Sequence, residues 1–415
     1  MPVRSVKTIR RSVWFQVRRI TLGPVNETNM ARIWNKHKQT NTPLKRKVFV
    51  GMSGGVDSAV SAALLKRQGQ DVVGVFMRTW HPEFLACNEE EERLDAMRTA
   101  AHLNIPFLTF DFEDVYKKEV ADYMIAEYKA GSTPNPDVMC NKEVKFGVFL
   151  KKALAMGADY VATGHYACIS ARDAFSQSLG PSLRSATPSK KHLSLSLIKS
   201  IDPTKDQSYF LWTLSQKQLG KILFPVGHLK KTEVRKLAKK FGLPVAEKKD
   251  SQGICFLGKV DLKEFLRHYI KLKKGKVVNA NGKEIGYHDG AMFYTLGERH
   301  GFFITEKSPN DKRYYIVDKD FKKNILIVSQ DRNISHSKIL TNIGIKNTNW
   351  ISELPNENKK YTAQIRYHGE LLSCRVKITG DKKTEIHFSN PIMVASGQSI
   401  VVYDGNVCLG GGIVI

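Results

Sequence analysis

A glycine-rich loop between a short apolar run and a helix constrains this chain more than any other feature. Val48-Phe49-Val50 predicts a buried strand, and the loop Gly51 to Ser58 follows it directly. A helical stretch then runs from Ala59 to about Gln68, and Asp71 to Met77 predicts the next strand. Strand, loop, helix and strand in this order form the unit of a parallel α/β sheet. The sequence therefore predicts an α/β domain that begins near residue 47.

The composition of this loop favours anion binding. Its small residues let the backbone approach an anion closely, and the N–H groups at the helix start point toward that anion. Ser53 and Ser58 add hydroxyl donors. A kinase-type phosphate loop needs Gly-Lys-Ser/Thr, whereas this loop has Asp57 in the equivalent region. The loop thus predicts a phosphate site of another kind, and the alternative is a glycine-rich turn without a ligand.

Two of the six cysteines lie in distinctive surroundings. Cys140 follows Thr133 to Asp137, where two prolines predict an extended, rigid loop. Cys255 lies 115 residues further on, two residues after Gly253, so only the fold could bring the two thiols together. The other cysteines are interpreted as small buried hydrophobic residues; they are Cys87, Cys168, Cys374 and Cys408. No Cys-x-x-Cys pair occurs, which argues against a zinc knuckle or an iron–sulfur site, and we expect no metal site of the protein's own.

The charge of the chain favours a polyanionic partner. The formal net charge is +25, and residues 1–47 contribute +11 of it from twelve Lys or Arg and one acid. The remaining chain is still basic, and basic side chains bind a phosphate backbone by releasing its counterions. Nucleic acid is the partner this predicts; the alternative is that the charge only keeps the chain soluble.

Residues 1–44 have the pattern of a mitochondrial transit peptide. Apolar residues recur there every three or four positions, and no acid occurs before Glu27. The prediction is cleavage on import and a location in the mitochondrial matrix, and the alternative is a disordered arm that binds nucleic acid. No apolar run approaches the roughly 18 residues needed to cross a bilayer, so no membrane partner is expected.

Several separated runs give the chain a resemblance to one family. Ser53 to Ser58 resembles the PP-loop of ATP pyrophosphatases, and the whole region from Lys47 to Ile415 resembles the mitochondrial form of the tRNA-specific 2-thiouridylases. The other matching runs are Thr133 to Asp137, Cys140 to Lys142, Ala162 to Ala167, Lys205 to Leu211, Gly253 to Phe256, Tyr294 to Gly297, Ala363 to Tyr367, Gly397-Gln398 and Val407 to Gly412. The chain departs from the family at Gln252 and at Glu298 to His300, and in a serine-rich stretch near residues 171–196.

The resemblance implies three folded parts. They are an α/β PP-loop catalytic domain with a parallel sheet (46–258), a small central domain (262–330) and a C-terminal β-barrel that binds tRNA (338–415). The closely spaced period-two patterns after residue 276 independently favour a small barrel. Residues 171–196 are expected to form a flexible insertion in the catalytic domain.

The resemblance also implies an activity, that of a tRNA-uridine 2-sulfurtransferase. The expected reaction is ATP-dependent 2-thiolation of the wobble uridine in mitochondrial tRNAs for Lys, Glu and Gln. ATP with Mg²⁺ would adenylate the C2 oxygen, and a cysteine persulfide would supply the sulfur. A cysteine desulfurase or a sulfur-relay protein would load that persulfide. Which sulfur species attacks the base stays open.

Site residues are carried over from the resemblance by position. Cys140 would be the catalytic nucleophile and Cys255 the persulfide carrier, while Asp137 would either transfer a proton or cap the turn after Pro136. The residues expected to bind ATP are Gly51, Met52, Ser53, Gly54, Gly55, Val56, Asp57, Ser58, Met77 and Gly164. The residues expected to contact tRNA are Asn135, Pro136, Asp137, His165, Lys205, Asp206, Gln207, Arg366, Tyr367 and Gln398.

Blander interpretations of some of these residues remain. His165 could be a histidine at a strand end whose hydrogen bonds are all made within the protein, and Lys205 to Gln207 could be only a polar turn. Two other functions also stay open for the chain. One is a PP-loop ligase with a small-molecule acceptor, similar to argininosuccinate synthetase. The other is a non-catalytic tRNA-binding protein with a relic ATP loop.

Overall fold

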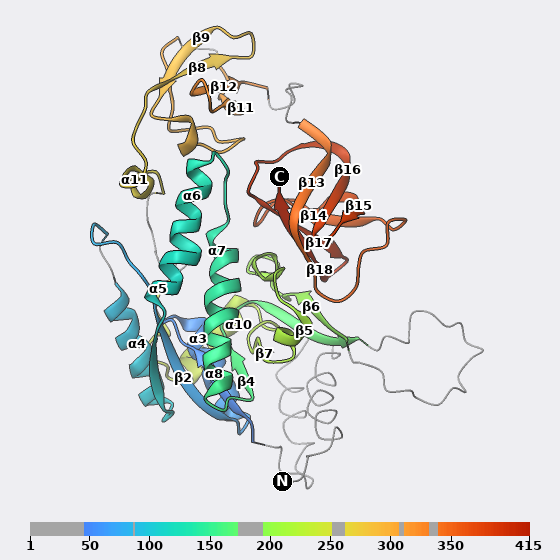
Figure 1. Cartoon of the computed structure of the whole chain (residues 1–415). Coiled ribbons are helices and arrows are strands. Elements are labelled where there is room, and N and C mark those ends of the chain that lie inside the picture. The colour runs from blue at the N-terminus through green and yellow to red at the C-terminus, as the bar shows by residue number, and fades with distance from the viewer. Residues whose placement is uncertain (1–44, 86–87, 173–193, 251–261, 307–310, 332–338) are drawn as a thin grey trace, which may run out of the picture.

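The computed structural model describes residues 45–85, 88–172, 194–250, 262–306, 311–331 and 339–415. The predictions for the transit peptide, for Cys87 and for Cys255 lie outside these ranges. The described chain forms an α/β domain, a small central β domain at one end of the molecule and a β-barrel beside them (Figure 1). The predicted fold class is therefore confirmed.

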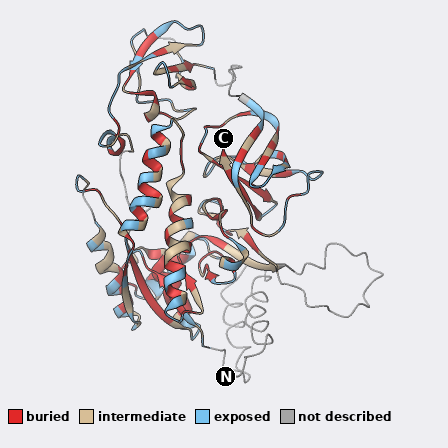
Figure 2. Cartoon of the chain, in the orientation of Figure 1, coloured by how far each residue is buried: buried red, intermediate tan, exposed pale blue. Residues whose placement is uncertain are grey.

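The α/β domain is built on a parallel sheet in the order β3-β2-β1-β4-β7. Its central strands are buried, as their unbroken apolar runs require (Figure 2). The chain moves from β1 to one side and later returns to β1 on the other, so a topological switch point lies between β1 and β4. The strands are β1 (Lys47–Gly51), β2 (Asp71–Arg78), β3 (Phe107–Asp111), β4 (Tyr160–Ala162) and β7 (Ile222–Leu223).

Helices cover this sheet, and two of the helical stretches contain π-helical turns. The helical elements are α3 (Val56–Arg67), α4 (Glu89–His102), α5 (Glu113–Tyr116), η1 (Lys117–Asp122), α6 (Tyr123–Lys129), α7 (Pro136–Met139), η2 (Cys140–Val148), α8 (Phe149–Ala155), η3 (Ser208–Leu211), α9 (Gln216–Leu219) and α10 (Lys231–Lys240). The extended loop predicted around the two prolines is wrong at Pro136, which begins α7. Proline suits the first helical position because its missing N–H has no partner there and its φ is already helical.

A hairpin of the catalytic region joins the barrel sheet instead of the parallel sheet. It consists of β5 (Ala167–Arg172) and β6 (Ser194–Lys199), and β6 also pairs with β18 of the barrel. The prediction of a flexible insertion at 171–196 is therefore wrong at both ends, where ladder hydrogen bonds fix the backbone. Residues 173–193 of that insertion lie outside the described ranges.

The C-terminal barrel closes through six antiparallel strands in the order β13-β16-β15-β14-β17-β18, with β18 pairing back onto β13. Closure leaves no free edge among these six strands. They are β13 (Ile339–Trp350), β14 (Tyr361–Gln364), β15 (Leu372–Gly380), β16 (Lys383–Met393), β17 (Ser399–Asp404) and β18 (Val407–Val414).

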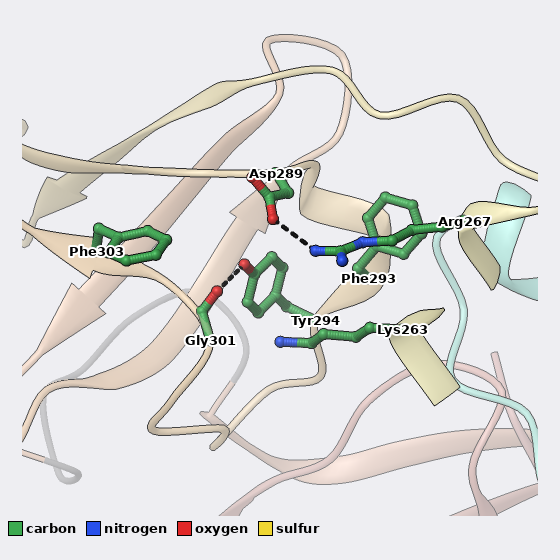
Figure 3. A pocket seen from close by; sticks show the side chains of 7 residues that line it. All are labelled: Lys263, Arg267, Asp289, Phe293, Tyr294, Gly301 and Phe303. Atoms are coloured by element: carbon green, nitrogen blue, oxygen red, sulfur yellow. Dashed lines mark hydrogen bonds and ion pairs between the residues drawn. The ribbon is translucent and has the colours of Figure 1, made fainter. Parts of the chain in front are cut away.

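The central domain is a five-stranded sheet in the order β10-β9-β8-β12-β11. Its elements are α11 (Leu262–Arg267), β8 (Gly275–Asn279), β9 (Glu284–His288), η4 (Ala291–Phe293), β10 (Phe303–Ile304), β11 (Tyr315–Asp320) and β12 (Ile325–Ser329). This domain contains a pocket of about 190 Å³, and the side chains that line it are drawn in Figure 3. Two pairs of its lining groups bind each other: Arg267 pairs with Asp289 at 2.9 Å, and the Tyr294 hydroxyl donates to the Gly301 carbonyl.

The main hydrophobic core is shared between domains. One buried cluster runs from Phe49 of the parallel sheet through the long helices to Tyr294 of the central domain and Tyr403 of the barrel. Burial across these boundaries holds the three parts together. Within the described ranges, no helix is long and apolar enough to span a membrane.

Candidate active site

The glycine-rich loop has the geometry of an anion cradle. Gly54 has a φ of +69°, and a Cβ atom there would lie 2.4 Å from the Glu92 carbonyl oxygen, so only glycine fits. The Ser58 hydroxyl accepts a hydrogen bond from the Ser53 N–H at 3.2 Å and donates to the Gly55 carbonyl at 3.1 Å. No side chain caps the N-terminus of α3, so its first N–H groups are available to a ligand. These residues therefore fit a nucleotide phosphate.

The residues expected to bind ATP converge at the carboxyl edge of the parallel sheet. A Cβ atom on Gly164 would lie 2.7 Å from the Ser58 nitrogen, which shows how closely the end of β4 approaches α3. A Cβ atom on Gly51 would lie 3.0 Å from Met77 Cε, at the ends of β1 and β2. Ligands of open α/β sheets bind at this edge, at the switch point. The predicted loop, Met77 and Gly164 are thus brought together where a nucleotide is expected.

A charge network begins at the loop's carboxylate. Asp57, in the first turn of α3, accepts hydrogen bonds from the Tyr166 hydroxyl at 2.7 Å and from Lys231 Nζ at 2.7 and 2.8 Å. Burial and the neighbouring Asp57 raise the pKa of Tyr166 far above its usual value, so the phenol stays a proton donor. Lys231 begins α10, and its side chain is only 13% exposed.

The network continues to Asp250. Its carboxylate binds Lys231 Nζ at 2.9 Å, Lys205 Nζ at 2.8 Å and the Arg235 guanidinium. Partial burial raises the pKa of Asp250, but hydrogen bonds and charges from Lys205 and Lys231 outweigh it and hold that pKa well below its usual range. Asp250 is therefore a carboxylate with three cationic partners.

The three domains meet at Thr133, just before the proline pair. The Thr133 N–H donates to the Ser396 carbonyl of the barrel at 2.7 Å, and its hydroxyl lies 3.3 Å from that of Thr295 in the central domain. Gly397, with a φ of +88°, packs on the same place, where a Cβ atom would lie 3.0 Å from the Thr133 nitrogen. The segment leading to Cys140 is thus fixed by both other domains.

Asn135 caps the helix that begins at Pro136. Its side-chain oxygen accepts a hydrogen bond from the Val138 N–H at 3.2 Å. The capping role considered for Asp137 therefore belongs to Asn135. In the barrel, burial and then the negative charges of Asp206 and Asp137 raise the pKa of Tyr367 to about 12.

Cys140 begins the π-helical turn η2 and is fully buried, with an exposed fraction of 0%. Single π turns are rare and are often found at functional sites. The next side chain, Asn141, donates to the Phe210 carbonyl at 3.4 Å, and the Phe210 ring packs on Tyr367 with centroids 4.4 Å apart. Since Cys255 lies outside the described residues, the pairing of the two thiols stays a prediction.

Comparison with known proteins agrees with this arrangement along the whole folded chain. Three family models match, described as the tRNA methyl transferase HUP domain (residues 46–259), the tRNA methyl transferase PRC-barrel domain (263–330) and the aminomethyltransferase beta-barrel domain (340–414). Proteins called tRNA-specific 2-thiouridylase MnmA, from Streptococcus thermophilus, Streptococcus mutans and Geobacillus thermodenitrificans, are each 43% identical to it over 89% of this chain and 95% of their own length. This chain belongs to the tRNA-specific 2-thiouridylase family.

The family assignment rests on these relatives, because the domain descriptions mention methyl transfer and the full-length relatives are named thiouridylases. The prediction that the chain is an enzyme, a tRNA sulfurtransferase, is confirmed. Solved structures are more distant. The U34-tRNA thiolase NcsA from Methanococcus maripaludis is 16% identical over 64% of this chain and 74% of its own, with a TM-score of 0.32. The named relatives are bacterial, so they do not bear on the location of this 2-thiouridylase.

Four of the residues expected to contact tRNA form hydrogen bonds or ion pairs with other residues of the protein. His165 is 7% exposed, its Nδ1 lies 2.7 Å from the Thr163 hydroxyl, and burial and then the charge of Lys145 lower its pKa well below 6.5. Lys205 pairs with Asp250, as described above. Asp206 accepts from the Ser200 and Ser208 N–H groups, and Gln207 accepts from the Tyr166 N–H at 3.0 Å. Their contacts with tRNA stay predictions.

The residues from the barrel are placed differently. Arg366 is exposed, while Tyr367 is half-buried against Phe210. Gln398 shapes the loop beside Gly397, where its side chain accepts from the Ala395 N–H at 3.4 Å. Arg366 is therefore the member of this group best placed for a phosphate.

Sequence reasoning missed the residues that link distant parts of this 2-thiouridylase. Lys231 and Asp57 are 174 residues apart, and Thr133 and Thr295 are 162 residues apart. The position of Lys231 at the start of a basic helix was the signal available for the first pair. For the second pair, the sequence held no signal, because a threonine contact between domains depends on how the domains pack.

Proposed function

We propose that this protein thiolates C2 of the wobble uridine in mitochondrial tRNAs, using ATP and a cysteine persulfide. The observation that carries the proposal is a single helical rod. It begins at Pro136, passes through Cys140 at the start of η2 and continues into α8, where Phe149 lies at the end of β1; a Cβ atom on Gly51 would be 3.6 Å from the Phe149 ring. One rod thus joins the thiol to the ATP edge, the carboxyl edge of the parallel sheet where the residues expected to bind ATP lie. That the substrate is tRNA follows from the family.

ATP supplies the activation of the base. The C2 oxygen of uridine is a poor leaving group, and adenylation converts it into AMP, which leaves readily. The loop and the first turn of α3 would hold the phosphates through N–H groups and the Ser53 and Ser58 hydroxyls. Met77 and Gly164, at the same sheet edge, would contact the adenosine.

Mg²⁺ is proposed to accompany the ATP. Within the described residues, no group of three or more His, Cys, Asp or Glu side chains could hold a metal ion. Mg²⁺ commonly binds through substrate phosphates and one or two carboxylates. Asp57 is the carboxylate at the loop that would complete such a site.

The sulfur step would use both thiols. In this proposal Cys255 carries the persulfide, and a cysteine desulfurase or relay protein loads it. The Cys140 thiolate attacks the inner sulfur of that persulfide, which releases the terminal sulfur as the nucleophile and leaves a Cys140–Cys255 disulfide. In the alternative order, the persulfide attacks the base first and Cys140 then releases the product. Because Asn135 already caps the helix, Asp137 is proposed as the proton-transfer group.

Reconstitution tests this function directly. The purified chain would be combined with cognate tRNA, ATP, Mg²⁺, a cysteine desulfurase with its substrate, and a thiol reductant that reduces the Cys140–Cys255 disulfide after each turnover, and nucleosides would be analysed by mass spectrometry. The expected products are 2-thiouridine and one pyrophosphate per thiolated base. Tight tRNA binding without pyrophosphate release would instead favour the non-catalytic binding protein.

The mitochondrial location is proposed from the amphipathic, acid-poor N-terminus and is tested separately. A fusion of residues 1–44 to a fluorescent reporter should enter the matrix and lose the leader. A matched fusion in which the leader arginines are replaced by glutamine should stay in the cytosol, since import of such a helix depends on its positive charge. Cytosolic fluorescence of the unaltered fusion would contradict the proposal.

A further inference from the structure

The glycine-rich loop lacks the cation that polyphosphate binding calls for. Gly51 to Ser58 contains no lysine or arginine and one acid, Asp57. Kinase-type phosphate loops carry a lysine within the loop, which reaches the β- and γ-phosphates. Backbone N–H groups and hydroxyls supply only partial charge, so a polyphosphate beside Asp57 calls for a positive side chain from elsewhere.

Lys231 is the cation that the fold brings to this place. Its Nζ lies 2.7 Å from Asp57 Oδ1 and 2.8 Å from Oδ2, although 174 residues separate the two in the chain. Asp57 is in the first turn of α3, the end of the helix whose N–H groups face an anion. A phosphate bound at that helix end would therefore lie beside Lys231.

The surroundings allow this lysine to turn toward a phosphate. Asp250, its second carboxylate partner, also binds Lys205 at 2.8 Å and the Arg235 guanidinium. Asp57 also accepts from the Tyr166 hydroxyl at 2.7 Å. Neither carboxylate would be left without a partner if Lys231 turned to a ligand, so the usual penalty for an unpaired, partly buried charge is avoided.

We infer that Lys231 is a further ATP-binding residue, whose ammonium group binds the pyrophosphate portion of ATP at the N-terminus of α3. This inference rests on the proposed use of ATP and adds a residue that the loop pattern does not contain. The opposing interpretation is that Lys231 is only a structural ion pair holding α10 against α3. The two interpretations predict different effects of removing Lys231. A pyrophosphate-binding lysine affects the affinity for ATP but not for AMP, because AMP lacks the pyrophosphate portion.

The test compares ATP, AMP and inorganic pyrophosphate on the full-length protein by titration calorimetry with Mg²⁺ and without tRNA. Lys231→Met removes the charge, and Lys236→Met is the matched control on the exposed face of the same helix. Lys231→Met should weaken ATP and pyrophosphate binding by about 10- to 100-fold, the scale of a hydrogen bond to a charged group. AMP affinity should stay within about twofold, and Lys236→Met should change none of the three.

Equal weakening of ATP and AMP, or no change in either, would overturn the inference. If Lys231→Met does not fold, Lys231→Gln keeps a hydrogen-bond donor for Asp57 and gives the same contrast between ATP and AMP. The wild-type protein separates the two proposals. If it binds ATP but makes no 2-thiouridine, the proposed function fails while the role of Lys231 stands.

Discussion

At the scale of single residues, the proposed function divides the chemistry between a loop that would bind phosphate and two thiols that would transfer sulfur. Asp57 and Ser58 lie at the N-terminus of α3, whereas Cys140 lies in the helical rod that begins at Pro136 and reaches the end of β1 at Phe149. Activation and sulfur transfer are separate chemical steps. Single substitutions should therefore block different steps.

The first prediction concerns this division of labour. Asp57→Ala should lower pyrophosphate release by roughly 100-fold or more, the scale of one electrostatic group in a reaction site. Cys140→Ser and Cys255→Ser should still release pyrophosphate with cognate tRNA but give no 2-thiouridine, because serine is nearly isosteric yet far less acidic. Persulfide labelling should persist in Cys140→Ser and in Asp57→Ala. A normal thionucleoside yield from either cysteine variant would sink the role assigned to that cysteine.

His165 gives a prediction about pH and stability. Burial and then the charge of Lys145 hold its pKa well below 6.5, so the unfolded chain binds a proton there more readily than the native protein. The contribution of His165 to the unfolding free energy is therefore fully present above about pH 6.5. As the pH falls below that value, the contribution decreases by up to about 1.4 kcal/mol per pH unit. The difference in urea unfolding free energy between wild type and His165→Gln should change between pH 7.5 and pH 5. A difference that does not vary with pH would contradict a buried neutral imidazole.

At the scale of elements, the fit between β4 and α3 sets the shape of the ATP edge. Gly164→Ala would place a methyl group 2.7 Å from the Ser58 nitrogen and 2.8 Å from the Asp57 carbonyl carbon. The loop after β4 must then move away from α3. We expect a loss of about 1–3 kcal/mol in unfolding free energy and weaker ATP binding. Gly380→Ala is the control, since nothing lies within 4 Å of a Cβ atom there; similar effects from both variants would contradict this account.

The same scale shows what the sequence could predict. The first strand, loop and helix were predictable because apolar runs and glycines determine structure locally. The β17–β18 hairpin was predictable for the same reason, since Asp404-Gly405 is a local turn signal between two apolar runs. The helix at Pro136 was missed because a proline pair suits both an extended loop and a helix start. Capping by Asn135 decides for the helix. The pairing of the β5–β6 hairpin with the barrel was missed because Val407 of β18 pairs with Ile198 of β6, 209 residues earlier in the chain.

For the candidate site, the convergence of the loop, Met77 and Gly164 was easier to predict from the sequence than the exposure of the residues expected to contact tRNA. Gly51, Met77 and Gly164 follow strands of one parallel sheet, so their convergence follows from topology. The tRNA residues come from different domains, and their exposure depends on packing that no local pattern records. His165 and Asp206 illustrate this, because both are polar, yet His165 is buried and Asp206 is half-buried in the structure.

At the scale of the whole molecule, the barrel and the central domain fix the segment that carries the thiol. Thr133 contacts both, and Arg366 is exposed on the barrel near Tyr367. We predict that tRNA binding is spread over the α/β domain and the barrel, because the residues expected to contact tRNA lie in both and the chain carries a net charge of +25. Binding should therefore weaken steeply with salt.

Arg366→Ala tests this electrostatic contact. It should weaken binding of all cognate tRNAs and lower the slope of log affinity against log salt by about one unit if the guanidinium meets a phosphate. Binding would be measured by fluorescence anisotropy at several salt concentrations, with Arg375→Ala, also exposed on the barrel, as the control. An unchanged slope for Arg366→Ala would show that Arg366 contacts no phosphate.

The most direct test of the whole account is the wobble nucleoside of tRNA from cells with and without this gene. Mitochondrial and cytosolic tRNAs would be separated, digested and analysed by mass spectrometry. We predict that 2-thiouridine disappears from the wobble position of mitochondrial tRNAs for Lys, Glu and Gln, stays unchanged in cytosolic tRNAs, and returns with wild-type protein but not with Cys255→Ser. Normal 2-thiouridine in mitochondrial tRNA without the gene would contradict it.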